Sequence, residues 1–357
     1  MSAACKLEGL ELRNGWRVTR LLERDPNATG GNFSNCYLVE RLPGDSARRG
    51  VDRGFLKAFD FSRAFENGVD TIKTLQALTN AYEYERAILE HIRDRRLSHA
   101  VTAIDHGTVQ IEGFGQMEGR VFYLIFQLAD GDVRVQMDRA TARDALWCMM
   151  ALRDVTLGLH QVHREFIAHQ DTKPSNVLAY PGPRFRITDF GRSSMRGRAA
   201  PHDDFKIAGD RTYAPPELLY GQVDADFARR RVACDLYMLG NLAGFLFSGV
   251  NVSVELLARL APEHHPNQWS GTYAEVLPYV QTAFRSVLTD LEPLVDERVR
   301  AEVLAVVKEL CQPDVARRGH PRGVGGLSQF SLERYVSQMT RITKDLEVRM
   351  RIARKSA

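Results

Sequence analysis

Four polar residues within one short stretch place the strongest constraint on this chain. The stretch AHQDTKPSNVLAY, residues 168–180, contains His169, Asp171, Lys173 and Asn176. A helical apolar pattern precedes it and an apolar run follows it, so the core should hold this polar loop at both ends. A carboxylate, an ammonium and an amide are therefore predicted to lie close together.

This set of groups suits phosphoryl transfer from ATP, which needs an oriented hydroxyl, ligands for Mg²⁺ and cations that offset charge. Asp171 can accept the hydroxyl proton, Lys173 can reach the transferring phosphate, and Asn176 can ligate Mg²⁺ through its amide oxygen. Asp189 in ITDFG is the expected second ligand, because it follows an apolar strand pattern and Gly191 allows a sharp turn.

At these residues the sequence resembles the protein kinase superfamily, in particular bacterial eukaryotic-like (Hanks-type) serine/threonine kinases. The catalytic loop H-x-D-x-K-x-x-N corresponds to residues 169–176, and the D-F-G signature to residues 189–191. The A-P-E signature appears as Pro-Pro-Glu at residues 215–217. Each motif is weak alone, but several in family order and spacing make a specific pattern.

Two further residues resemble structural parts of that family. Asp235, in CDLYMLG, resembles the aspartate that braces the catalytic loop. Arg318 resembles the arginine that pairs with the A-P-E glutamate, which is Glu217 here. Together with the upstream motifs, the resemblance extends from Gly30 to Arg318.

The upstream motifs imply a nucleotide-binding half. Gly30 and Gly31, in NATGGNFS, resemble the Gly-rich loop over the ATP phosphates, although NATGGN is also a good turn. Lys57 in FLKAF resembles the lysine that holds the α- and β-phosphates. Its expected ion-pair partner is Glu85, with Glu83 as the second choice.

Three residues after an apolar strand resemble the hinge that grips adenine through backbone groups. They are Gln127, Leu128 and Ala129, and the bulky Phe126 stands behind them. The resemblance therefore implies ATP and Mg²⁺ as cofactors and a serine or threonine hydroxyl of a protein as the acceptor.

The sequence departs from the family pattern at two positions. Gln170 stands where the family often has an arginine that receives an activation-loop phosphate, so we expect activity that is constitutive or driven by a partner. Asp210 stands where a threonine usually bridges the catalytic aspartate and lysine. It can bind Lys173, but it adds negative charge near Asp171, and Thr212 is an alternative for the bridging role.

The resemblance implies an α+β, two-lobed protein kinase fold. The strand-rich N-lobe is expected over residues 15–128, the larger helical C-lobe over 129–325, and a helical extension over 326–357, with its helix from about Leu327. One helix is predicted from Thr71 to about Arg93 by its apolar spacing.

Apolar residues in the C-terminal extension recur at alternating three- and four-residue steps, which is the pattern of a helix-packing seam. They are Leu332, Tyr335, Met339, Ile342 and Leu346. We favour packing of this seam on the chain's own large lobe, and the alternative is a contact with a partner or a second copy.

Composition limits the expected partners, cellular compartment and source of the chain. The net charge of +3 is too small to indicate nucleic acid as the main partner. Five scattered cysteines without C-x-x-C pairing predict reduced thiols in the cytoplasm. The uncharged stretch at residues 236–254 holds several polar residues and glycines, so we expect a buried helix and no membrane span. The Ala- and Arg-rich composition is typical of bacteria.

Three alternatives to a protein kinase remain open. The first is a pseudokinase, a nucleotide-binding scaffold that acts through a partner. The second is a small-molecule kinase, against which the Pro-Pro-Glu motif and Arg318 argue. The third is an interaction protein that acts mainly through the C-terminal helix.

Overall fold

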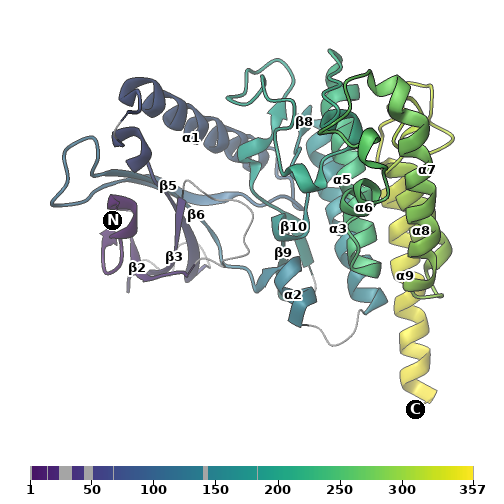
Figure 1. Cartoon of the computed structure of the whole chain (residues 1–357). Coiled ribbons are helices and arrows are strands. Elements are labelled where there is room, and N and C mark those ends of the chain that lie inside the picture. Colours follow the sequence, from purple (N-terminus) through teal and green to yellow (C-terminus); the bar gives the residue numbers. More distant parts are fainter. Residues whose placement is uncertain are drawn as a thin grey trace. The chain divides into compact units, whose positions relative to one another are not determined.

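The computed structural model describes residues 2–13, 15–23, 34–43, 51–66, 68–139, 144–182 and 184–356. The chain divides into two compact units. The first, the sheet unit, comprises Met1–Arg96 and Val101–Ala129, and the second, the helical unit, comprises Leu97–Ala100 and Asp130–Ala357 (Figure 1).

The sheet unit is built on a six-stranded antiparallel sheet with the strand order β1-β2-β3-β4-β6-β5. Its strands are β1 (Glu11–Leu12), β2 (Trp16–Leu21), β3 (Ser34–Arg41), β4 (Arg53–Phe59), β5 (Ala103–Gln110) and β6 (Arg120–Gln127). Strand β5 was not predicted, because most of its residues are only half-buried and its sequence is largely polar. Pairing with the apolar strand β6 stabilises it.

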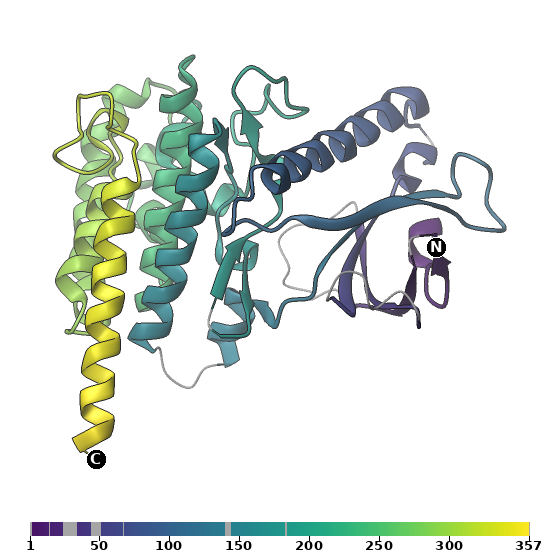
Figure 2. The ribbon, with the colours of Figure 1, turned by 180° about the vertical axis from the view of Figure 1, so that it is seen from behind.

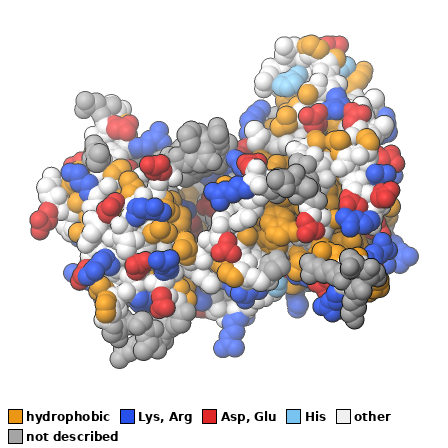
Figure 3. Space-filling model, turned by 90° about the horizontal axis from the view of Figure 1, so that it is seen from below, with side chains coloured by type: hydrophobic (Ala, Val, Ile, Leu, Met, Phe, Trp, Pro, Cys, Tyr) orange, Lys and Arg blue, Asp and Glu red, His pale blue; other side chains and the backbone are white. Residues whose placement is uncertain are grey.

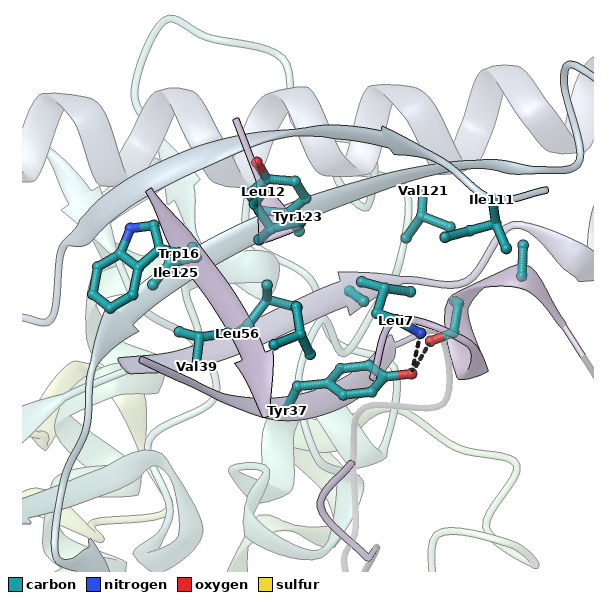
Figure 4. Close-up of a cluster of buried hydrophobic side chains, with 14 residues drawn as sticks. Leu7, Leu12, Trp16, Tyr37, Val39, Leu56, Ile111, Val121, Tyr123 and Ile125 are labelled. Carbon is teal, nitrogen blue, oxygen red and sulfur yellow. Dashed lines mark hydrogen bonds between the residues drawn. The ribbon is translucent and has the colours of Figure 1, made fainter. Parts of the chain in front are cut away.

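A large buried cluster of this unit lies on one face of the sheet (Figure 4). Alternate residues of the strands point into it, including Val39, Leu56 and Ile125. The N-terminal segment completes this core, because Tyr37 Oη donates a hydrogen bond to Ala4 O at 2.7 Å and Leu7 is fully buried. Residues before 15, where the resemblance places the start of the N-lobe, thus pack into this unit.

Helix α1 (Thr71–Asp94) belongs to the same unit. Asp70 caps it by accepting a hydrogen bond from Lys73 N at 3.1 Å. Its buried face includes Ile88 and Ile92, one turn apart, as the apolar spacing predicted. Glu85 is buried on that face, whereas Glu83 is exposed.

The helical unit contains α2 (Val133–Arg139), α3 (Ala145–Arg164), α4 (Pro216–Leu219), α5 (Ala233–Ser248), α6 (Val252–Ala258), α7 (Tyr273–Leu291), α8 (Arg300–Leu310) and α9 (Glu333–Ser356). Its short strands are β7 (Gly131–Asp132), β8 (Ile167–Ala168), β9 (Val177–Tyr180), β10 (Arg184–Ile187) and β11 (Ser194–Met195). They form a three-stranded sheet, β10-β9-β7, and the pair β11-β8. These strands begin and end next to the polar loops of the predicted site.

Helix α5 is buried along nearly its whole length, because α3 and α8 pack against it. A helix that is apolar all round is expected at such a position. Among the described residues, no single helix has the length and apolar character of a membrane span. The pair Ala228–Ser248 and Val252–Ala258, bent by 92°, meets that test only when both parts are taken together.

The C-terminal helix α9 packs along α3 (Figure 2). The predicted seam is buried by the chain itself, and Thr156 Oγ1 on α3 donates to Met339 Sδ at 3.0 Å. The helix begins at Glu333, later than the predicted Leu327. The preceding residues form turns, in which the Gln329 side chain donates to the carbonyl oxygens of Val315, Ala316 and Arg318. A partner could use this seam only if α9 left α3.

Surface charge is mixed on the face drawn in Figure 3. Lysine and arginine side chains there lie among aspartate and glutamate side chains, with apolar atoms between them. This distribution matches the near balance of 48 basic and 45 acidic residues in the sequence.

Candidate active site

A buried carboxylate on α5 holds the loop that contains the predicted catalytic residues. Asp235 Oδ2 accepts a hydrogen bond from His169 N at 2.7 Å, and its Oδ1 accepts one from Gln170 N at 2.6 Å. Asp235 is fully buried, so these charge-assisted bonds form away from water, where they are strong. The predicted bracing role of Asp235 is confirmed.

Both carboxylate oxygens of Asp171 accept hydrogen bonds. Asn176 Nδ2 donates to Oδ2 at 2.8 Å, and Asp210 N donates to Oδ1 at 2.7 Å. Lys173 Nζ lies 3.5 Å from Oδ2. These three contacts from different directions leave the Asp171 side chain little rotational freedom.

The environment of Asp171 raises the pKa of its carboxyl above the usual value. Burial is the main cause, and the charge of Asp189 adds to it. Lys173 and the backbone N–H of Asp210 act in the opposite direction without cancelling the burial effect. A carboxylate with a raised pKa accepts a proton more readily than one in water.

The carboxylate of Asp210 contacts Lys173, as the sequence suggested. Lys173 Nζ donates to Asp210 Oδ2 at 3.1 Å, and the backbone N–H and hydroxyl of Thr212 donate to Oδ1 at 2.9 and 2.7 Å. Burial alone would raise the pKa of Asp210, but the hydrogen bonds from Thr212 and Lys173 lower it. Asp210 contacts Asp171 through its backbone N–H, which stabilises the Asp171 carboxylate.

The two predicted metal ligands lie on neighbouring segments of the helical unit. Asn176 uses its amide nitrogen on Asp171, which leaves the amide oxygen as a ligand. Asp189 has a left-handed backbone, with φ 63°, at the end of the strand pattern. His169 supports this turn, since its Nε2 lies 2.9 Å from Thr188 O and its ring contacts Phe190 edge-on.

The described residues contain no group of three or more His, Cys, Asp or Glu side chains placed to bind a metal ion. Protein sites for Mg²⁺ often supply only one or two carboxylate or amide oxygens, and substrate phosphates and waters supply the rest. Asn176 and Asp189 therefore fit Mg²⁺ that binds together with a nucleotide.

The predicted ion pair of the sheet unit is present. Lys57 Nζ, on β4, donates to both carboxylate oxygens of Glu85 on α1, at 2.8 and 3.1 Å. The Glu85 side chain is 5% exposed and that of Lys57 is 18% exposed. Lys57 is therefore held in place by a buried carboxylate, while its own side chain is partly exposed.

Five further residues were predicted to contact the nucleotide, in the hinge and in the Gly-rich loop. Gln127 ends β6, where it pairs with Gly54 of β4, and Leu128 and Ala129 continue the chain at half-buried positions. Gly30 and Gly31 lie outside the described residues. The nucleotide-binding roles of these five residues stay predictions.

Glu217 and Arg318 form the second ion pair that the sequence predicted. Arg318 Nη1 and Nη2 donate to the two Glu217 oxygens at 2.7 and 2.8 Å. Arg318 also donates to Gln312 O and Ala233 O. This pair joins α4, which follows the activation segment (residues 192–213), to the turn after α8.

Sequence reasoning missed Gly209. A methyl group at this position would lie 2.6 Å from Asp171 Oδ1 and closer still to the carbonyl oxygen of Gln170. Only glycine lets the segment before Asp210 approach the catalytic loop so closely. The Gly-Asp-Arg-Thr-Tyr run at residues 209–213 gave the available signal, because it places a glycine directly before the residue that contacts Asp171.

Comparisons with known proteins agree with this geometry. A family model described as a protein kinase domain matches residues 73–320. Serine/threonine-protein kinase PknA of Mycobacterium tuberculosis is 31% identical over 137 residues, which is 38% of this chain and 30% of that protein. Serine/threonine-protein kinase KIN28 of Saccharomyces cerevisiae is 40% identical over 76 residues, 21% of this chain and 23% of that protein.

A third relative is the CTD kinase subunit alpha of Saccharomyces cerevisiae. It is 27% identical over 161 residues, which is 44% of this chain and 30% of that protein. The chain thus spans less than a third of the length of each of these relatives.

Proposed function

The chain belongs to the protein kinase family, and from this premise we propose that it transfers the γ-phosphoryl group of ATP to serine or threonine hydroxyls of a protein substrate. One observation carries the proposal. The Asp171 carboxylate is fixed by Asn176 and by the Asp210 backbone, with the Lys173 ammonium 3.5 Å away.

Each residue of this group has a distinct task in the proposed reaction. Asp171 orients the acceptor hydroxyl and takes its proton, for which its raised pKa is suited. Lys173 offsets negative charge that develops on the transferring phosphoryl group. Asn176 and Asp189 would hold Mg²⁺, which neutralises phosphate charge when it is bound. Lys173 in this loop also favours serine or threonine over tyrosine, by resemblance.

The sheet unit would bind the nucleotide. Lys57, held by Glu85 at 2.8 Å, offers a positioned cation for the α- and β-phosphates. Gln127, Leu128 and Ala129 would offer backbone groups to adenine, as in the family. We also propose a cytoplasmic setting, because none of the five described cysteines forms a disulfide, which suits a reducing compartment. A bacterial source is proposed from the Ala- and Arg-rich composition.

Intact-mass analysis tests the proposal directly. The protein is incubated with Mg-ATP, alone and with a generic protein substrate, and the added phosphate is counted. Asp171→Asn keeps the shape of the side chain and removes the base, so the rate should fall by about 10²–10⁴-fold. Asp345→Asn, at an exposed position on α9, is the matched control and should transfer phosphate like wild type.

The result also separates the alternatives. Wild type that takes up no phosphate and modifies no substrate, while ATP still raises its Tm, would replace the kinase proposal with a nucleotide-binding scaffold. Transfer to aminoglycosides or choline without transfer to proteins would indicate a small-molecule kinase.

A further inference from the structure

A buried arginine links the catalytic loop to the activation segment. Arg231 lies in the π-helical turn Ala228–Val232, directly before α5, and is 5% exposed. Its Nη1 donates to Gln170 Oε1 at 2.7 Å, and its Nη2 donates to both Asp203 Oδ1 and Asp203 O at 3.1 Å. One planar guanidinium therefore holds two segments that are distant in sequence.

Gln170 is the residue through which this link reaches the site. Its backbone has a positive φ of 61°, which residues other than glycine rarely adopt. Its Nε2 donates to Arg192 O at 3.1 Å and to Ser194 Oγ at 2.8 Å. The backbone continues directly from Gln170 to Asp171, so a change in the Gln170 conformation would move the Asp171 carboxylate.

Asp203 closes the network from the other side. Ser194 Oγ donates to Asp203 Oδ1 at 3.3 Å, and Ala200 N donates to Asp203 Oδ2 at 2.7 Å. Gln170, Arg231, Asp203 and Ser194 thus form a closed ring of hydrogen bonds, which we call the Arg231 ring. A buried guanidinium needs a nearby anion, and the Asp203 carboxylate supplies one from the activation segment itself.

Access to the ring differs among its members. The Asp203 side chain is 41% exposed, whereas Gln170 and Ser194 are 4% and 3% exposed. The Ser194 hydroxyl is therefore closed to another kinase while the ring is intact. The ring also provides a fixed negative charge where an added phosphate would otherwise be needed to order the segment.

We propose that Arg231 and Asp203 are positioning residues for phosphoryl transfer. They hold Gln170, and through it Asp171, in the reactive arrangement by means of a carboxylate that belongs to the chain. The enzyme is therefore active without phosphorylation of residues 192–213. This inference rests on the proposed kinase function for its activity readout, but the link between the two segments is a structural claim of its own.

The activity test uses protein treated with phosphatase and verified by intact mass. Asp203→Ala should lower kcat by about 10- to 100-fold, the equivalent of one or two lost charge-assisted hydrogen bonds. The KM for ATP should stay within about twofold, because no ring residue is proposed to bind the nucleotide. Asp203→Glu should restore most of kcat, since it returns the anion.

The matched control is Asp204→Ala, which removes the neighbouring exposed carboxylate. It should keep the kcat of wild type. Arg231→Met should lower kcat as Asp203→Ala does, and the double variant should be no worse than either single one, because both break the same ring. Asp203→Asn, which keeps the side-chain shape, serves if the alanine variant does not fold.

Amide hydrogen exchange tests the link without any activity. In Asp203→Ala, exchange should accelerate at residues 168–171 as well as at Ala200, whereas Asp204→Ala should leave both unchanged. A wild type without transfer, but with this linked exchange, would refute the kinase function and keep the structural link. A wild-type kcat and unchanged exchange at residues 168–171 in Asp203→Ala would overturn the inference. Activity that appears only with phosphate on the segment would overturn it too.

Discussion

Two ion pairs, one in each unit, have the same type of chemistry but differ in how far they are exposed to solvent. Glu217 and Arg318 are 6% and 0% exposed and meet through two parallel hydrogen bonds. Lys57 and Glu85 are 18% and 5% exposed, and the cation is a lysine. The first pair is buried on both sides, whereas the second is partly exposed on the lysine side.

The difference indicates which pair supports the fold and which is suited to bind a substrate. The Arg318 guanidinium donates hydrogen bonds to Glu217 and to two backbone carbonyl oxygens. Lysine is a compact cation on a flexible stem, so Lys57 can contact Glu85 and a phosphate together. We therefore expect substitutions in the first pair to change stability and those in the second to change nucleotide binding.

Arg318→Met should cause the largest loss of stability. It leaves the Glu217 carboxylate buried without its cation, so the free energy of unfolding should fall by about 3–5 kcal/mol. Urea unfolding followed by circular dichroism measures this change. Arg317→Met, at the exposed neighbouring position, is the control and should change stability little. Equal effects of the two substitutions would contradict a structural role for the pair.

A buried histidine should make the stability of the helical unit depend on pH, because protonation would place a positive charge beside two arginines. His202 is 2% exposed, and burial, with Arg192 and Arg231 nearby, lowers its pKa from 6.5 to about 4. The unfolded chain then binds this proton first, so stability should fall as the pH drops from about 6.5 to about 4. The contribution has an upper limit of about 3 kcal/mol.

The measurement is urea unfolding across this pH range for wild type and for His202→Gln. The variant should show the shallower fall, because the other titrating groups are common to both proteins. Identical slopes would show that His202 binds its proton as readily in the folded protein as in the unfolded chain.

Gly209→Ala should lower both the stability of the protein and its rate of phosphate transfer. Its methyl group would displace Gln170 and Asp171, and overpacking of this kind costs about 1–3 kcal/mol of stability. The rate of phosphate transfer should also fall in the fraction that remains folded, since the displaced carboxylate is the proposed base. Gly326→Ala, where the added methyl group meets only an ordinary contact at 3.4 Å, is the control. Unchanged transfer by Gly209→Ala would show that the close approach is not required.

Lys57→Met should lower stability by less than Arg318→Met does, because the Lys57 side chain is 18% exposed whereas that of Arg318 is fully buried. The expected loss lies in nucleotide binding, at least about tenfold in Kd for one charge-assisted phosphate contact. The shift of Tm with ATP measures it, with the exposed Lys73→Met as control. A large loss of stability with full ATP binding would reverse the comparison of the two pairs.

Local patterns predicted several parts of this molecule well. Apolar spacing located α1, because its buried face repeats every three or four residues. Motif spacing brought Asp171, Lys173, Asn176 and Asp210 into one site, since they lie on loops anchored by short strands. The pairing of Lys57 with Glu85 also followed from motif order.

Other parts depend on contacts that no local pattern contains. Strand β5 is largely polar and becomes a strand only by pairing with β6. The turns before Glu333 are held by Gln329 and three carbonyl oxygens of another segment. The Arg229–Arg231 run gives no hint of which arginine is buried, because that depends on where the π-helical turn points each side chain.

The sequence by itself therefore determined which chemical groups stand at the site and in what order, because residue type and spacing are local properties. Only the tertiary structure decided how these groups are held. Asp235 braces the loop across 66 residues of sequence, and Arg231 reaches Gln170 across 61. Such contacts arise from the packing of α5 against the strands and loops, and packing depends on the whole chain at once.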